Sequence, residues 1–511
     1  MRYAEGPFYL NTLYDPCYVY LVSSLNLAQL VSPAHFDHPG IPVQVIGAIV
    51  IKITHLFNNR TSDIAVDVLS HPEFYLGVIH FFLSLINCII LFISSLVIFN
   101  AVKNIFVTLL LQLSPFTSYM VSYELSVITA ETFMISVIML LIAYSIKFIK
   151  TGKNAGTNFV LIFSIICGLG IATKLTFLPL LIIPVILLNG FKDKIKFLFL
   201  TGFLFIIFFL PSFSNLSYFF GWIKNLFLFD GIYGKGNPDI INTSVFFANA
   251  GKIISENPFF SMIFLMLIFT CAFNLKNLKK SGKPESVSQE SKLLKAIFIS
   301  MLFQLIIVAK HYSGHYIVPA VMLTITGLYL CINLSSQSGF SFNSKLKTNY
   351  IYSTLIFLIL TFTVIDTVFN YKDQESKKEN ALETSELIEN ISEDGILISS
   401  YGSSSRAYAL AFSVKWAGKN IDKYNNIIHS IYPNDLYFDF WANHIYSVSE
   451  KNSGDKGIKK DKKVYFLNKY LESNGLILND LQNNYDFKEY TITEIHSSDN
   501  GEKVYEISHK K

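Results

Sequence analysis

The stretch FYLGVIHFFLSLINCIILFISSLVIF, residues 74–99, decides the fold class of this chain. It is an almost unbroken apolar run, and it exceeds the roughly 20 residues that an α-helix needs to cross a bilayer. The whole 511-residue chain has the same character, with 51% hydrophobic and 15% charged residues and a mean hydropathy of +0.42. These values exclude an ordinary soluble globular protein and indicate an integral membrane protein.

Further apolar runs predict about ten membrane spans in total. They fall near residues 74–99, 104–123, 131–149, 158–173, 175–190, 195–213, 257–274, 293–309, 315–334 and 350–369. Lysines cluster in alternate connecting segments, and the positive-inside rule assigns those segments to the cytoplasm. An even number of crossings then places residues 1–73 and the chain after residue 370 on the extracytoplasmic side.

Three regions follow from this pattern. Residues 1–73 are predicted to be an extracytoplasmic loop with two amphipathic surface helices, near 17–31 and 41–57, and residues 74–370 are the transmembrane bundle. The second surface helix could instead be an eleventh span, but Lys52 inside it favours a helix lying on the membrane with its ammonium among the headgroups.

The chain becomes polar and charged over residues 371–511. GILISSYGSSS at 395–405 is typical of a strand and turn, KKVYFL at 462–467 of a strand, and Asp499-Asn500-Gly501 of a hairpin turn. The serines at 403–405, together with Arg406, could bind an anion, although a polar turn is the simpler interpretation. The predicted fold is therefore an all-α polytopic membrane bundle with a small C-terminal α/β extracytoplasmic domain.

Charge and cysteine content argue against several classes of site. The net charge of +4 is too small and too scattered to predict nucleic-acid binding, and the five cysteines form no CxxC pair. HFDHPGIP, residues 35–42, gathers two histidines and an aspartate that could hold a metal ion, but a turn between two surface helices is the preferred interpretation. No metal ligand or cofactor is assigned, and participation of a divalent cation stays open.

Acidic residues at two places in the sequence are candidates for acid–base chemistry. Asp15, in LYDPCYVYL, could be a general base or simply the cap of a helix that begins at Pro16. Glu124 and Glu131 bracket the turn after the second span, although Glu131 could also be only a first-turn residue favoured by the helix dipole. The topology places both groups at the extracytoplasmic mouth of the bundle.

Cations are predicted at the same mouth. Lys174, in GLGIATKLTF, lies on the side where the positive-inside rule disfavours lysine, beside a helix N-terminus suited to phosphate. Lys310, His311 and Tyr316, in AKHYSGHYIVPA, occupy another turn there, where interfacial anchoring is the alternative interpretation.

At these residues the sequence resembles the GT-C membrane glycosyltransferases of the protein O-mannosyltransferase and lipid A aminoarabinose transferase type. Four elements match in order, over about residues 10–330. They are Asp15 followed by a helix and the DHPG turn (37–40), LSPFTSYMVSYELSVITAETF (113–133), GLGIATKLTFLPLLIIPVILL (168–188) and KHYSGHYIVPAVML (310–323). The sequence departs from the family at Pro16, where a second acidic residue is common, and at Glu131, where aspartate is usual.

The resemblance implies transfer of a sugar from a polyprenyl-phosphate donor in the membrane to an extracytoplasmic acceptor by direct, inverting displacement. Asp15 would be the general base and Glu131 a supporting carboxylate, with Lys174 and Lys310 stabilising the leaving phosphate. Substrate contacts are further expected from four residues of the two turns, namely Asp37, His38, His311 and Tyr316.

Two other functions compete with this one. A multi-span transporter or flippase would need polar or broken helices near the membrane midplane and often an internal repeat. The polar residues here gather at one face, and no repeat is evident. A non-catalytic scaffold whose outer domain binds a partner is the second alternative.

Overall fold

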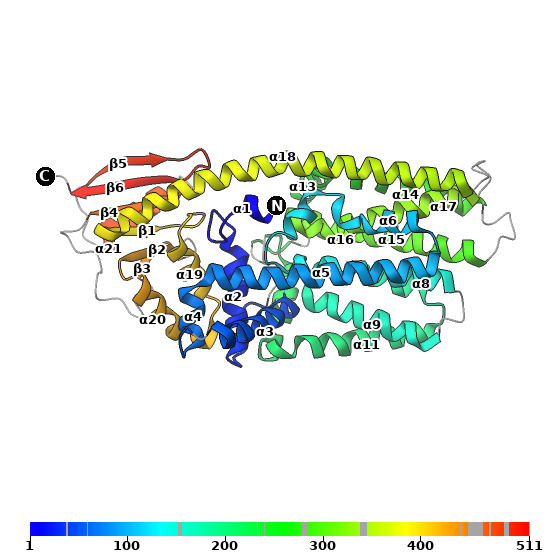
Figure 1. Cartoon of the computed structure of the whole chain (residues 1–511), viewed down its shortest axis with the longest axis horizontal. Helices are drawn as coiled ribbons and strands as arrows, with labels where there is room; N and C mark the ends of the chain where they lie inside the picture. Colours follow the sequence, from blue (N-terminus) through cyan, green and yellow to red (C-terminus); the bar gives the residue numbers. More distant parts are fainter. Residues whose placement is uncertain are drawn as a thin grey trace.

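The computed structural model describes most of the chain: residues 1–36, 39–58, 60–151, 156–231, 234, 236–239, 241–277, 285–337, 345–439, 442–447, 463–469, 472–484 and 490–509. The molecule is elongated, with a helical bundle at one end and a small mixed sheet at the other (Figure 1). The N-terminal segment lies between these two parts, beside the middle of the long helix that connects them.

Long apolar helices make up the bundle. They are α5 (Pro72–Val102), α8 (Ala130–Thr151), α9 (Gly156–Thr173), α11 (Phe191–Phe209), α14 (Pro258–Asn277), α15 (Glu285–Lys310), α17 (Thr324–Gln337) and α18 (Lys345–Asp394). Large apolar side chains on their outer faces remain exposed, such as Phe81 on α5, Phe199 on α11 and Phe357 on α18. Apolar surface on this scale matches the hydrocarbon of a bilayer.

Seven helical segments of the described residues are long and apolar enough to cross a membrane, or eight if the bent pair Thr243–Glu256 and Pro258–Ala272 counts as one span. The predicted polytopic membrane bundle is confirmed, with fewer full-length spans than the ten expected. The predicted runs at 158–173 and 175–190 form shorter apolar helices, Asn158–Thr173 and Leu175–Leu187.

The predicted span at 104–123 is broken into short pieces. Asn104 caps α6 (Ile105–Gln112) through its side-chain oxygen, which accepts hydrogen bonds from Phe106 and Val107. Pro115 then interrupts the helix, because proline has no N–H to donate and clashes with the preceding turn.

The remaining short elements around the bundle are η1 (Ser114–Phe116), α7 (Tyr119–Glu124), η2 (Leu175–Leu181), α10 (Ile182–Leu187), η3 (Leu210–Asn215), α12 (Leu216–Leu228), α13 (Thr243–Glu256), η5 (Gly314–Ile317) and α16 (Val318–Met322).

Basic chain segments lie at the bundle end that is farthest from the sheet. α8 ends there with Lys150 in its last turn, and α18 begins there at Lys345 (Figure 1). This arrangement agrees with the charge pattern of the sequence, and the extracytoplasmic position of the sheet domain stays a prediction of the positive-inside rule.

The N-terminal segment contains α1 (Arg2–Glu5), α2 (Tyr14–Ala28), α3 (Ile41–Asn58) and α4 (Ile64–Ser70). α2, which was predicted to be a helix on the membrane surface, is covered by protein, because nearly all of its residues are buried. It packs between α3 and α19 (Arg406–Val414) of the C-terminal part. Its sequence shows apolar residues on every face, which is typical of a helix covered on all sides.

The C-terminal part contains η6 (Gly418–Asn420), α20 (Ile421–Ile431), α21 (Glu472–Asn484) and six strands, namely β1 (Ile396–Ser399), β2 (Asp435–Asp439), β3 (His444–Ser447), β4 (Val464–Asn468), β5 (Tyr490–Ser497) and β6 (Lys503–His509). They form one mixed sheet in the order β3-β2-β1-β4-β6-β5. The predicted strands at 395–405 and 462–467 and the hairpin at Asp499-Asn500-Gly501 are confirmed. The predicted boundary at residue 370 falls inside α18, which continues to Asp394.

A buried polar contact joins the N-terminal segment to the C-terminal domain. Asn26 of α2 is fully buried, and its amide donates to the carbonyl of Ala417 at 2.8 Å. Its side-chain oxygen accepts from the hydroxyl of Tyr424 at 2.8 Å and from the amide of Asn420 at 2.9 Å. Because the partners are all in the C-terminal domain, this contact fixes how that domain sits against the N-terminal helices.

We expect Asn26→Leu to destabilise the protein by about 1–3 kcal/mol, since it leaves several buried polar groups without partners. Asn225, which is exposed on α12, provides the matched control, and Asn225→Leu should change stability little. Thermal unfolding in detergent measures both. Equal melting temperatures for the wild type and Asn26→Leu would contradict the importance of this contact.

Candidate active site at the mouth of the bundle

A buried ion pair forms the centre of the site. Glu131 lies in the first turn of α8 and Lys174 directly precedes η2, and their side chains are only 2% and 4% exposed. The Lys174 ammonium donates to a carboxylate oxygen of Glu131, and it lies 4.9 Å from the ring centroid of Tyr316. Burying one charge without the other would be costly, so each compensates the other.

The backbone around Lys174 explains its position. α9 ends at Thr173, and Lys174 itself is extended, with its N–H donating to the carbonyl of Gly170 at 2.9 Å. The N–H of Gly40 donates to the carbonyl of Thr173 at 2.9 Å, which joins the Pro-Gly turn to this point. Gly40 has a φ of +62°, and the Tyr20 side chain fills the place where a Cβ would lie. Only glycine fits this close approach.

Glu124 adds a second buried carboxylate. It ends α7, is 4% exposed, and accepts a hydrogen bond from the Thr129 hydroxyl at 2.7 Å. Burial, followed by repulsion from the negative charge of Glu131, raises the pKa of Glu124 to about 8. Glu124 is therefore mainly protonated at neutral pH, and the buried cluster of Glu124, Glu131 and Lys174 is close to electrically neutral.

Asp15 differs from both buried carboxylates because it is exposed to solvent. It interrupts the start of α2 with non-helical dihedral angles, φ −104° and ψ 103°. The C-terminal domain contacts this kink, since the Tyr401 hydroxyl donates to Asp15 Oδ2 at 3.3 Å and the N–H of Gly402 donates to the Tyr14 hydroxyl at 2.7 Å. The sheet domain thus holds the loop that carries Asp15.

One cavity of about 420 Å³ brings these groups together. Its volume lies within the roughly 300–1,000 Å³ that small-molecule sites occupy. Polar and aromatic side chains from the N-terminal segment, the bundle and the C-terminal domain line it: Asp15, Tyr20, His35, Tyr123, Glu124, Thr129, Glu131, Lys174, His315, Tyr316 and Trp416. A carboxylate open to solvent and a buried cation therefore share one cavity.

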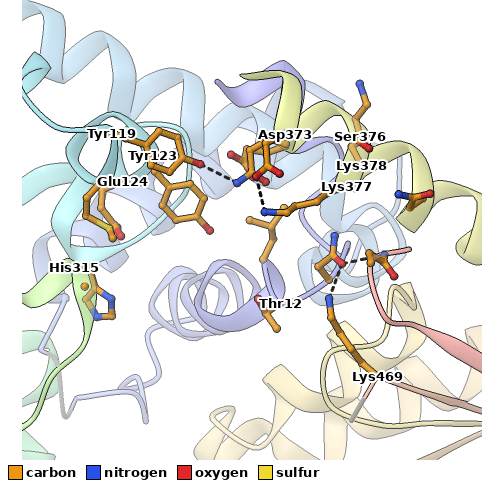
Figure 2. A pocket seen from close by; sticks show the side chains of 18 of the residues that line it. Thr12, Tyr119, Tyr123, Glu124, His315, Asp373, Ser376, Lys377, Lys378 and Lys469 are labelled. Carbon is orange, nitrogen blue, oxygen red and sulfur yellow. Dashed lines mark hydrogen bonds and ion pairs between the residues drawn. The ribbon is translucent and has the colours of Figure 1, made fainter. Parts of the chain in front are cut away.

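A second cavity of about 710 Å³ adjoins the first, and the two share Leu13, Tyr123, Glu124 and His315 in their walls. Figure 2 shows this second cavity, with Glu124 and His315 on one side, α18 residues such as Lys377 on another, and Lys469 of the C-terminal domain on a third. The two cavities therefore meet at these four residues.

The structure gathers four of the predicted site residues. Asp15, Glu131, Lys174 and Tyr316 all line the first cavity. The remaining two in the Pro-Gly turn, Asp37 and His38, lie outside the described residues.

Lys310 and His311 lie elsewhere in the described part of the chain and line neither cavity. The Lys310 ammonium donates to the carbonyls of Leu226 and Phe227 at 2.7 and 2.9 Å, and His311 Nε2 lies 3.2 Å from the carbonyl of Leu226. These carbonyls belong to the C-terminal end of α12, whose last carbonyls attract cations. Both side chains therefore secure α12 against α15.

Several residues in or beside the first cavity were not predicted from the sequence. His315 lies 3.9 Å from Glu131, although no role was assigned to it from the sequence. Tyr401 contacts Asp15 across 386 residues of sequence, and Trp416 reaches the cavity from the same domain. No local pattern could reveal them, because their position depends on how the C-terminal domain packs.

The described residues contain no group of three or more His, Cys, Asp and Glu side chains that could hold a metal ion. The metal interpretation of HFDHPGIP involves Asp37 and His38, which lie outside the described residues.

The raised pKa of Glu124 predicts a pH dependence of stability. The folded protein holds a proton that the unfolded chain releases near its ordinary pKa of 4.5, so wild-type stability falls as the pH rises from about 5 to about 8. We expect Glu124→Gln to remove this fall and to be more stable than the wild type at pH 8 by on the order of 4 kcal/mol. Melting temperatures across this pH range test it.

The exposed Glu379 supplies the control, since Glu379→Gln should keep the wild-type profile. Parallel pH profiles for the wild type and Glu124→Gln would show that the Glu124 carboxyl is not buried as described.

No protein-family model and no curated protein sequence matches the chain. Among solved structures, it is similar to the crystal structure of ArnT from Cupriavidus metallidurans bound to undecaprenyl phosphate, with 11% sequence identity and a TM-score of 0.41, over 96% of this chain and 96% of that chain.

Proposed function

We propose that this protein is a membrane glycosyltransferase that moves a sugar from a polyprenyl-phosphate donor to a hydroxyl-bearing acceptor. The observation that carries the proposal is the cavity that Asp15 and Lys174 share at one end of an apolar helical bundle. A base for an acceptor hydroxyl and a cation for a phosphate are the two groups that such a transfer requires. The family resemblance of the four sequence motifs supports the same class of reaction.

The donor would reach the site from the membrane. Its polyprenyl chain stays among the apolar helices, while its phosphate enters the cavity beside Lys174. At 4% exposure, the Lys174 ammonium acts on a phosphate with little screening by water, and electrostatic interactions are strongest in such surroundings. Glu131 keeps the ammonium in place before the donor arrives.

The reaction is a direct displacement. The acceptor oxygen forms a bond to the anomeric carbon as the bond from that carbon to the phosphate oxygen breaks, so the anomeric configuration inverts. The phosphate departs with the bonding electron pair, and Lys174 stabilises the charge that develops on it. The hydroxyl proton passes to Asp15, the carboxylate in the cavity that is open to solvent.

The buried carboxylates would tune this site without attacking the sugar. Because the raised pKa of Glu124 keeps it mainly protonated, an incoming phosphate meets one buried negative charge beside Lys174, that of Glu131, rather than two. The neutral carboxyl of Glu124 also adds a hydrogen-bond donor next to the ion pair. The charge of the cluster therefore favours the donor more than three ionised groups would.

Binding of undecaprenyl phosphate tests the donor half of the proposal without knowledge of the sugar. We expect it to raise the melting temperature of the wild-type protein in detergent, because a ligand that binds the folded state stabilises it. Undecaprenol, which lacks the phosphate, should have a much smaller effect. In Lys174→Ala the affinity for undecaprenyl phosphate should fall at least tenfold, since a charge-assisted hydrogen bond is lost.

Lys310→Ala is the matched control, because its ammonium binds the end of α12 and lies outside both cavities. It should bind undecaprenyl phosphate like the wild type. Equal stabilisation by undecaprenol and by its phosphate, or unchanged phosphate binding in Lys174→Ala, would refute the proposed donor site.

A further inference from the structure

Glu5 is the most unusual group in the second cavity. It ends α1, is only 5% exposed, and lines the cavity wall. Its Oε1 atom is buried and has no hydrogen-bond partner among the described residues. A buried carboxylate oxygen without a partner is expensive to keep, and such groups call for an explanation in each protein. A ligand in the cavity that donates a hydrogen bond would supply the missing partner.

The remainder of the cavity lining consists largely of groups that bind hydroxyls. Side-chain amides both donate and accept hydrogen bonds, and tyrosine rings offer flat apolar faces with a polar edge. The amides, hydroxyls and rings of the lining are Asn11, Thr12, Tyr119, Tyr123, Gln374, Ser376, Asn380 and Asn500. This mixture suits a molecule that carries many hydroxyl groups on small apolar ring faces.

The charges of the lining do not favour an anion. Asp373 already accepts from Lys377 at 2.6 Å, and the Lys469 ammonium donates to the side-chain oxygen of Asn11 at 3.0 Å. The ionised groups of the lining nearly balance: because Glu124 is mainly protonated, Asp373, Asp499 and a partly ionised Glu5 face Lys377, Lys378 and Lys469. A phosphate or carboxylate would find no large surplus of positive charge here.

Peptide binding by strand addition is also disfavoured. The lining residues belong to helices, to the N-terminal loop, to the end of β4 and to the β5–β6 turn, and none of them lies within a strand. The open edges of the sheet are β3 and β5, whose residues are absent from the lining that the structure describes. The cavity therefore offers side chains rather than a backbone edge.

We propose that the second cavity binds the acceptor and that the acceptor is a neutral glycan, with Glu5 accepting hydrogen bonds from its hydroxyls. This inference rests on the proposed function. The wall shared at Leu13, Tyr123, Glu124 and His315 is where one hydroxyl of the glycan passes towards Asp15 in the first cavity. The rest of the glycan stays between α1, α18 and the C-terminal domain.

The protonation of Glu5 agrees with this role. Burial raises the pKa of Glu5 to about 7, opposed by the nearby charge of Arg2. The carboxyl can therefore accept from one hydroxyl or, when protonated, donate to another, and both kinds of bond occur in the recognition of hydroxyl groups.

Saturation-transfer NMR on the full-length protein in detergent tests the inference with three neutral probes, maltotriose, chitotriose and mannotriose. We expect at least one of them to bind the wild-type protein. Glu5→Gln should weaken that binding about tenfold, because it removes a hydrogen bond to a charged acceptor. The same substitution should leave the melting temperature unchanged or higher, because the unpartnered charge is removed, whereas a purely structural residue would lower it.

Asp435 supplies the matched control. It is a buried carboxyl at the start of β2 whose pKa burial also raises to about 7, and it lies outside the lining of both cavities. Asp435→Asn should bind the glycan like the wild type. Failure of all three glycans to bind, unchanged binding in Glu5→Gln, or Glu5-dependent binding of a serine-rich peptide or of inorganic phosphate instead would each overturn the inference.

A binding experiment with undecaprenyl phosphate distinguishes a failure of this inference from a failure of the proposed function. If that lipid binds through Lys174 but no glycan binds, the acceptor assignment fails and the donor site stands. If a glycan binds through Glu5 but the lipid does not, the proposed transfer fails and the second cavity stands as a glycan-binding site.

Discussion

The ion pair of Glu131 and Lys174 constrains everything around it. Two ionised groups at this depth are tolerated only as long as they face each other, which fixes the start of α8 against the end of α9. The Pro-Gly turn is joined to the same point through Gly40. Glu124, Tyr316 and His315 surround the pair, so the first cavity takes its shape and its charge from this single contact.

The C-terminal domain is built into the site rather than attached beside it. Its loop after β1 contacts the kink at Asp15 and Tyr14, and its buried contact with Asn26 holds α2. α18 runs without interruption from the bundle into the sheet domain (Figure 1). A helix of this length couples the position of the second cavity, which it lines, to the position of the sheet. Both cavities therefore exist only where the three parts of the chain meet.

Local sequence patterns predicted the parts of the molecule that depend on local physics. Apolar runs located most of the bundle, and alternation with turn residues located β1, β4 and the hairpin at Asp499-Asn500-Gly501. The motifs carrying Asp15, Glu131 and Lys174 were predicted to share one mouth, and the structure places them in one cavity.

The features that the sequence did not predict depend on distant contacts. The covering of α2 by α3 and α19 was not predicted, because it involves residues far away in the sequence. Lys310 was predicted at the site, whereas the carbonyl end of α12 holds it elsewhere. Glu5 and Tyr401 carry no recognisable motif, since their significance arises only from the cavity and the carboxylate that they meet.

The most direct test of the account is sugar transfer in membranes from a labelled polyprenyl-phosphate sugar, comparing the wild type with Asp15→Asn. The substitution keeps the size of the side chain but removes the base, so the account predicts that transfer falls by about 10²-fold or more while the fold stays intact. The exposed Asp193, at the start of α11, gives a matched Asp193→Asn control that should transfer normally. Transfer at the wild-type rate in Asp15→Asn would contradict the central role of this carboxylate.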